Sequence, residues 1–109
     1  MSNFKYSGKK LFIEKTSVKN IAKINKTPFY LYSKQQIKKN YFNFAKIFKA
    51  VNPLICFAAK ANTNLTILRI LGKLGSGADV VSGGELLKAL KAGIKPNKIV
   101  FSGVGKTEE

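Results

Sequence analysis

Short apolar runs alternate with longer stretches of helical periodicity along most of this chain. Each run is followed by a polar loop and then by a segment in which apolar residues recur every three or four positions. Strands that alternate with helices at this spacing indicate βα units and a parallel sheet. The four predicted strands cover residues 29–32, 54–59, 78–81 and 99–101.

Polar residues ahead of the helical segments predict where three helices begin. Ser33 has Gln36 three residues later, and Ser82 stands in the same relation to Glu85, so both pairs predict capping boxes. Asn64 is the predicted cap of the helix between them. The predicted stop signals are Pro53, Gly75, Gly93 and Pro96.

Four βα units account for residues 27–109 and would form the first half of an eight-stranded βα barrel. Residues 107–109 predict the opening turn of a further helix, with acidic side chains at its positive end. Because parallel sheets are covered on both faces, we expect a chain that is cut short within a larger domain. Residues 1–26 fit the pattern poorly. Their apolar positions predict one or two strands that pack on something outside the barrel.

The charge of the chain is strongly basic, with a formal net charge of +15. An excess of this size is also typical of nucleic-acid-binding proteins, which remain the alternative class. Among the 20 basic residues only Arg69 is an arginine, and the lysines are scattered. We therefore interpret the charge as solvated helix faces and expect no nucleic-acid partner.

Cysteine and histidine content restricts the chemistry further. Cys56 is the single cysteine and there is no histidine, which excludes an internal disulfide and zinc sites built from these ligands. No apolar signal-peptide core follows Met1, and the longest apolar run is too short to cross a bilayer. We expect a cytoplasmic chain with no membrane partner and no metal.

Lys60 is the residue with the clearest chemical potential. Side chains alternate between the two faces of a strand, so Lys60 would share its face with the small Cys56 and Ala58. The bulkier residues would then face the helices, and Lys60 would enter the mouth of the barrel, where barrel enzymes hold their active sites. Apolar walls there would favour the neutral amine that Schiff-base chemistry requires. The alternative is an ordinary exposed lysine at a strand end.

Two segments resemble a known family. Residues 57–62, Phe-Ala-Ala-Lys-Ala-Asn, resemble the cofactor-lysine motif of the fold-type III pyridoxal-phosphate-dependent decarboxylases. Residues 77–86, Gly-Ala-Asp-Val-Val-Ser-Gly-Gly-Glu-Leu, resemble the diaminopimelate decarboxylase branch, and the likeness extends from residue 27 to the end. It implies an α/β fold, namely the N-terminal half of a cofactor-binding (β/α)8 TIM barrel of the alanine racemase type. The preceding segment would pack on a C-terminal β domain.

The resemblance also implies site residues. Lys60 would carry pyridoxal 5'-phosphate covalently and take part in catalysis, while Asp79 and Glu85 would contact the cofactor. A surface carboxylate is the alternative for Asp79, and the capping box already explains Glu85. Asn62 and Ser102 are weaker candidates for lining the mouth.

The reaction implied by the resemblance is the conversion of meso-2,6-diaminopimelate to L-lysine and carbon dioxide in lysine biosynthesis, by a homodimeric full-length enzyme. In this family the phosphate-binding loop and the substrate ligands come later in the chain. We therefore expect the 109-residue chain alone to be inactive. The alternatives are an ornithine, arginine or carboxynorspermidine decarboxylase of the same fold, a non-catalytic paralogue, or a basic nucleic-acid-binding module.

Overall fold

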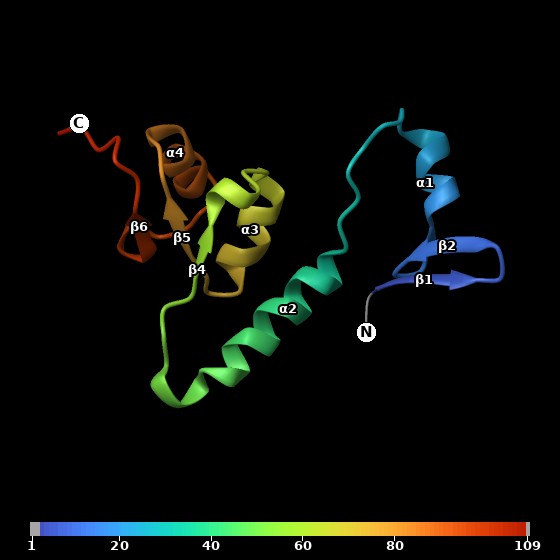
Figure 1. Ribbon diagram of the computed structural model, residues 1–109, viewed down its shortest axis with the longest axis horizontal. Coiled ribbons are helices and arrows are strands. Elements are labelled where there is room, and N and C mark those ends of the chain that lie inside the picture. Colours follow the sequence, from blue (N-terminus) through green and yellow to red (C-terminus); the bar gives the residue numbers. More distant parts are fainter. Residues whose placement is uncertain (1–2, 109) are drawn as a thin grey trace. The chain divides into compact units, whose positions relative to one another are not determined.

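The computed structural model describes residues 3–108 and divides the chain into two compact units, one up to Asn40 and the other from Tyr41 onward. Each unit contains a small sheet of its own (Figure 1). The first sheet is antiparallel and the second is parallel.

The N-terminal unit begins with three short strands and a helix. They are β1 (Phe4–Ser7), β2 (Lys10–Ile13), β3 (Thr16–Ser17) and α1 (Val18–Ile24). Neighbouring strands are antiparallel in the order β1-β2-β3. Gly8 and Glu14 open the two connecting turns with positive φ angles of 57° and 52°, the backbone region that tight hairpin turns require. The assignment of residues 1–26 to a separate β domain stays a prediction.

The first predicted strand of the barrel, residues 29–32, is absent from both sheets of the described chain. Tyr30 within it is 89% exposed. A strand is stabilised by hydrogen bonds to a neighbouring strand, and these residues belong to no ladder, so their apolar character alone does not produce one. The prediction of a strand there was wrong for this structure.

Helix α2 (Lys34–Ile47) begins at the predicted position, but only half of its capping box forms. The backbone N–H of Gln36 donates to Ser33 Oγ at 3.0 Å. The Gln36 side chain accepts from the backbone N–H of Asn3 at 2.9 Å and donates to Asn40 Oδ1 at 2.8 Å. The Gln36 side chain was expected to bond back to the backbone of Ser33, and it bonds instead to Asn3 and Asn40.

The second unit contains the parallel sheet. Its strands are β4 (Cys56–Ala58), β5 (Gly77–Val80) and β6 (Ile99–Phe101), and the helices that lie wholly within it are α3 (Leu65–Lys73) and α4 (Gly83–Lys91). Single 3₁₀ turns occur at η1 (Lys49–Val51), η2 (Ala59–Ala61) and η3 (Pro96–Lys98). The strands are adjacent in the order β4-β5-β6. Three of the four predicted strands thus form the predicted parallel sheet.

Both helices of this unit have the predicted ends. Asn64 Oδ1 accepts from the N–H of Thr66 at 2.9 Å at the start of α3, and Ser82 caps α4 in the same manner. Gly75 and Gly93 follow the helices with φ angles of 98° and 86°, the left-handed conformation that ends helices. The local sequence therefore determines where these helices start and stop.

The core of the second unit lies between its sheet and its helices. Ala78 and Val80 of β5 are fully buried against it, as are Leu68 of α3 and Ala89 of α4. The remaining members of the cluster are Ala59 and Ile94, with Phe57, Leu86, Ala92, Ile99 and Phe101 packed against them. Because strand side chains alternate, Asp79 lies on the opposite face of the sheet, the helix-free face, which α3 and α4 do not cover.

Candidate functional site

The carboxyl ends of the parallel strands bring the candidate residues to one edge of the second unit. The strand β4 ends at Ala58, and Lys60 lies in the single turn of η2 rather than on the strand as predicted. The turn is closed by a hydrogen bond from Asn62 N–H to Ala59 C=O at 3.0 Å. Lys60 is therefore still at the carboxyl end of the sheet, but on a turn.

The residue before Lys60 is buried in the core, whereas the Lys60 side chain is exposed to solvent. Ala59 is 0% exposed and belongs to the core cluster, whereas Lys60 is exposed. The apolar walls expected around this amine are not formed by residues 3–108. The described chain provides a fixed attachment point for the lysine but leaves its amine in contact with solvent.

Asp79 lies on the helix-free face of β5, in register with Ala58 of β4 and Val100 of β6. Ser102 Oγ donates a hydrogen bond to Asp79 Oδ1 at 2.5 Å. A short bond of this kind from a hydroxyl to a carboxylate is charge-assisted. The structure thus joins two residues that the sequence suggested separately, Asp79 as a cofactor contact and Ser102 as a lining residue.

Glu85 lies in the first turn of α4, where its carboxylate is used in capping. Glu85 Oε2 accepts from the backbone N–H of Val81 at 2.9 Å, and Ser82 Oγ accepts from Glu85 N–H at 3.2 Å. The carboxylate therefore reaches the residue before the cap, one position earlier than in the usual capping box. This contact explains Glu85 without any cofactor, and a role in cofactor binding stays a prediction.

Asn62 stabilises the loop that leads from Lys60 to α3. Its Oδ1 accepts from the backbone N–H of Asn64 at 3.0 Å, which forms an Asx turn ahead of the helix cap. The neighbouring Thr63 Oγ1 accepts from Lys88 Nζ at 3.0 Å, which connects this loop to α4. The side chain of Asn62 thus shapes the loop next to Lys60.

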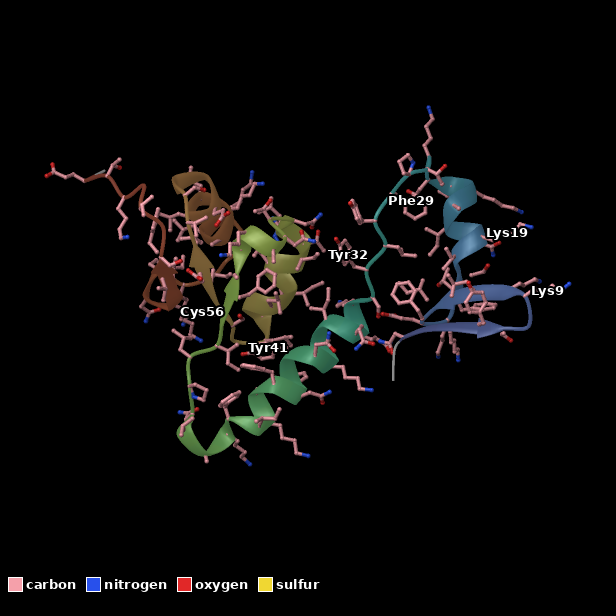
Figure 2. The ribbon with its side chains drawn as sticks, viewed as in Figure 1. Lys9, Lys19, Phe29, Tyr32, Tyr41 and Cys56 are labelled. Carbon is pink, nitrogen blue, oxygen red and sulfur yellow. The ribbon has the colours of Figure 1, made fainter. Side chains whose placement is uncertain are left out.

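Cys56 and Gly77 face each other below Asp79 on the helix-free side. A Cβ at Gly77 would lie 2.2 Å from the carbonyl oxygen of Lys98 and 2.8 Å from Cys56 Sγ, so only glycine fits. Burial raises the pKa of the Cys56 thiol, and the negative charge of Asp79 adds to this effect. Both effects disfavour the reactive thiolate of Cys56, whose side chain is labelled in Figure 2.

Two glycines of the second unit, one at the start of β5 and one after β6, were not singled out by the sequence as site residues. Gly77 had a weak signal, since a glycine inside a strand often marks a close approach of another backbone. Gly103 had none, yet a Cβ there would lie 2.4 Å from the carbonyl oxygen of Val81. Both positions depend on chain segments that are distant in sequence.

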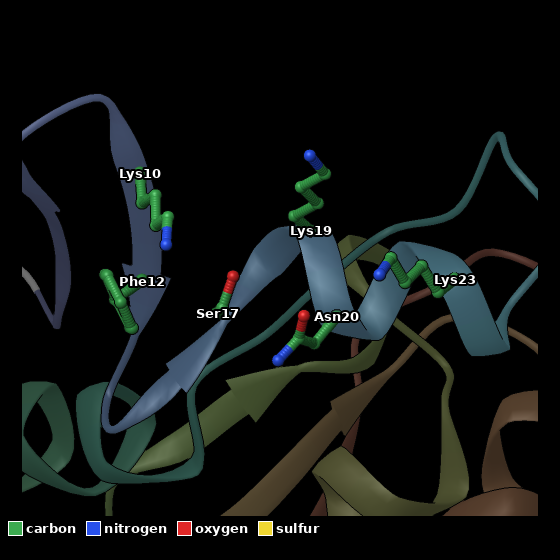
Figure 3. A pocket seen from close by; sticks show the side chains of 6 residues that line it. All are labelled: Lys10, Phe12, Ser17, Lys19, Asn20 and Lys23. Carbon is green, nitrogen blue, oxygen red and sulfur yellow. The ribbon is translucent and has the colours of Figure 1, made fainter.

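A cavity of about 340 Å³ in the N-terminal unit is distinct from this edge. Its lining residues are Lys10, Phe12, Ser17, Lys19, Asn20 and Lys23 (Figure 3). Lys19 extends its amine away from Asn20, so the polar groups do not converge on one point. Its lining offers lysine amines but no carboxylate beside them, and we assign it no catalytic role.

The residues at the carboxyl edge fit an aldehyde cofactor such as pyridoxal phosphate. Lys60 offers an accessible amine on an anchored turn, and Asp79 offers a carboxylate that Ser102 orients. On the helix-free face, Ala58 is paired with Asp79, and the small residues Cys56 and Gly77 lie further from this edge, at the start of the two strands. Among residues 3–108 no cluster of histidine, cysteine and carboxylate side chains could hold a metal ion.

A known family matches most of this chain. The family model described as pyridoxal-dependent decarboxylase, pyridoxal binding domain, matches residues 34–109. The chain therefore belongs to the pyridoxal-dependent decarboxylases, and the resemblance noted at residues 57–62 and 77–86 is confirmed. The α/β fold class and pyridoxal as the family's cofactor are confirmed with it.

The curated relatives that match this chain include diaminopimelate decarboxylases of two bacteria. The chain is 62% identical over 82 residues to a diaminopimelate decarboxylase of Helicobacter pylori strain J99, covering 75% of this chain and 20% of the relative. It is 49% identical over 109 residues to one of Pseudomonas fluorescens, covering 100% of this chain and 26% of the relative. The chain thus spans about a fifth to a quarter of the length of the curated relatives it matches.

Solved structures of amino-acid decarboxylases also match this chain. The diaminopimelate decarboxylase of M. jannaschii in complex with L-lysine matches with a TM-score of 0.91 and 40% identity, over 96% of this chain and 26% of that one. A lysine decarboxylase of Selenomonas ruminantium matches with a TM-score of 0.79 and 30% identity, over 99% of this chain and 27% of that one. Within the described residues, no helix has the length and apolar character to cross a membrane.

Proposed function

We propose that this chain is the part of a diaminopimelate decarboxylase that holds pyridoxal phosphate through Lys60. The observation that carries the proposal is the accessible amine of Lys60 at the carboxyl end of β4, within a segment that resembles the cofactor-lysine motif. The 62% identity to a diaminopimelate decarboxylase supports this substrate class over other amino-acid decarboxylases. The activity belongs to the full-length enzyme, and the 109-residue chain alone would be inactive.

Each residue of the edge has a proposed role. Lys60 Nζ would hold the cofactor, and Asp79 would present a carboxylate beside it. Glu85 would keep the start of α4 in place through Val81 and would contact the cofactor only if its carboxylate can leave that bond. When bound, pyridoxal phosphate supplies an electron sink for the negative charge left behind as a carboxylate departs. The residues of this chain contribute attachment, orientation and electrostatics.

The proposed substrate is meso-2,6-diaminopimelate and the proposed product is L-lysine. The M. jannaschii structure named as a complex with L-lysine supports a site in this family that accepts the product. We further propose a cytoplasmic homodimer that binds no nucleic acid, in which the basic side chains of this chain are solvated surface groups.

Cofactor trapping tests the role of Lys60. The full-length protein would be mixed with an equimolar amount of pyridoxal phosphate, reduced with borohydride, digested and analysed by mass spectrometry. We expect one pyridoxyl group per chain, on the peptide that contains Lys60. Equimolar cofactor matters because 20 basic residues, almost all of them lysines, could react in excess reagent.

Two variants make the trapping experiment specific. Lys60→Arg should abolish the labelled peptide, while Lys73→Arg, at an exposed lysine that ends α3, should leave it unchanged. Labelling of some other lysine, or equal labelling of the Lys60→Arg variant, would overturn the proposal.

A second experiment tests the substrate. Release of carbon dioxide by the full-length enzyme would be compared for meso-diaminopimelate, ornithine, arginine and lysine. We expect kcat/KM to be highest for meso-diaminopimelate by at least about a hundredfold, because leaving buried polar groups of a site unpaired strongly disfavours the wrong substrate. A preference for ornithine, arginine or lysine would assign the chain to another branch of the family.

A further inference from the structure

The segment after β6 is pressed against the end of β5. Ser102 N–H donates to Val80 C=O at 3.0 Å, which continues the pairing of the two strands by one residue beyond β6. At the next position, a Cβ on Gly103 would lie 2.4 Å from the carbonyl oxygen of Val81 and 2.9 Å from its Cα. The two backbones are therefore closer at Gly103 than any side-chain-bearing residue would permit.

This close approach determines where the Ser102 hydroxyl lies. Ser102 sits between the ladder bond to Val80 and the contact of Gly103 with Val81, so its backbone is held on both sides. From this position its Oγ donates to Asp79 Oδ1. The bond joins the end of β6 to the helix-free face of β5, at the edge where Lys60 follows β4.

We propose that Ser102 is a positioning residue for Asp79, and that Gly103 is required because it allows Ser102 to reach that carboxylate. This inference rests on the proposed function, because the proposed function places Asp79 beside the cofactor at the carboxyl edge of the parallel sheet. Ser102 itself need touch neither cofactor nor substrate. Its hydroxyl limits the rotation of the Asp79 side chain by holding one carboxylate oxygen, Oδ1, and leaves the second, Oδ2, for other contacts.

The physical reason is that a side-chain carboxylate at a solvent-accessible edge has several rotamers of similar energy. A charge-assisted hydrogen bond from a donor on a rigid backbone selects one of them. A catalytic arrangement that is loose by about an ångström loses much of its advantage. Ser102 would thus act on the reaction only through Asp79.

A double-mutant cycle in the full-length holoenzyme tests this dependence. Ser102→Ala should lower kcat about tenfold, with KM for meso-diaminopimelate changed by less than about twofold, because an orienting bond to a charged group is lost. In the background of Asp79→Ala, which removes the acceptor of the Ser102 hydroxyl, the same Ser102→Ala substitution should have almost no further effect on kcat. Ser102→Thr, which keeps the hydroxyl, should restore most of the rate.

A readout besides activity is the retention of cofactor. The dissociation constant for pyridoxal phosphate, measured by the change in cofactor absorbance, should rise in Ser102→Ala and recover in Ser102→Thr. Gly103→Ala should reproduce the Ser102→Ala phenotype although both Ser102 and Asp79 remain. Gly105→Ala is the matched control, since nothing lies within 4 Å of a Cβ at that glycine.

The outcomes separate this inference from the function on which it rests. If Ser102→Ala lowered kcat by the same factor in the wild-type and Asp79→Ala backgrounds, or had no effect, the positioning role would be excluded while Lys60 could still be trapped with cofactor. If Lys60 were not labelled by borohydride, the proposed function itself would fail. Circular dichroism of each variant distinguishes a local effect from a loss of folding.

Discussion

The hydroxyl of Ser33 donates a hydrogen bond to Glu14 Oε1 at 2.7 Å. The same carboxylate oxygen accepts from the backbone N–H of Gln35 at 3.0 Å, while Ser33 Oγ caps Gln36. Glu14 opens the turn after β2, so this relationship attaches the N-terminal sheet to the start of α2. It also brings a negative charge to the positive end of the helix, where the free N–H groups favour it.

The Glu14 contact predicts a specific dependence of stability on pH. The hydrogen bond from Ser33 and then that from Gln35 hold the pKa of Glu14 below its ordinary value of 4.5. Between the lowered pKa and the ordinary one, the unfolded chain binds more protons than the folded chain, so stability falls as pH falls through this window. The urea midpoint of the chain, measured from pH 7 downward, should decrease below about pH 4.5.

Glu14→Gln isolates this contribution. The variant should be less stable than the parent at pH 7 and should show a shallower decline on acidification, because it no longer has a carboxylate to protonate there. Glu108→Gln, at an exposed carboxylate in the second unit, is the control and should keep the parent's slope. Equal slopes for Glu14→Gln and the parent would contradict the prediction.

Leu68 is fully buried between α3 and the parallel sheet, and its truncation should destabilise the second unit. We expect Leu68→Ala to lower the free energy of unfolding by about 2–5 kcal/mol, through lost apolar burial and the cavity left behind. Leu87→Ala offers a matched comparison, since Leu87 is 68% exposed on α4. Its effect in urea denaturation should be below about 0.5 kcal/mol, the usual size for surface changes.

Two glycine substitutions should act in opposite directions. Gly77→Ala forces a Cβ against the Lys98 carbonyl and Cys56, and should cost about 1–3 kcal/mol of stability. Gly83→Ala, at the first position of α4 with nothing within 4 Å of the new Cβ, should stabilise by about 0.5–1 kcal/mol. Adding Cys56→Ala to Gly77→Ala should rescue stability only in part, because the backbone oxygen of Lys98 cannot move away.

Cys56 should react slowly with alkylating reagents in the folded chain. Its thiol has a raised pKa, chiefly from burial and then from Asp79, so little thiolate is present near neutral pH. Alkylation by iodoacetamide at pH 8 should be slower than in the urea-unfolded chain, and Asp79→Asn should accelerate it in the folded state. Folded and unfolded rates that agree would show that the thiol is neither buried nor influenced by that charge.

Local sequence was sufficient for much of the second unit. Caps at Asn64 and Ser82 and the stops at Gly75 and Gly93 lie where predicted, because capping depends on hydrogen bonds within a few residues. The motif at residues 57–62 correctly indicated the family, since the match covers that segment.

Contacts between residues far apart in the chain determined the features that local sequence patterns could not predict. Residues 29–32 resembled a strand but have no ladder to join, and Gln36 bonds to Asn3 rather than to its own cap. The partners of Asp79 and Gly103 came only from the folded chain.

The sequence by itself determined the three strands of the parallel sheet, the caps and stops of α3 and α4, and the family to which the chain belongs. The tertiary structure decided that Ser102 meets Asp79, that Glu14 meets Ser33 and that Gly77 and Gly103 must lack side chains. The difference has one physical cause. Helix caps and strand alternation depend on neighbours along the chain, whereas those contacts join residues about 20 positions apart, which only folding brings within reach.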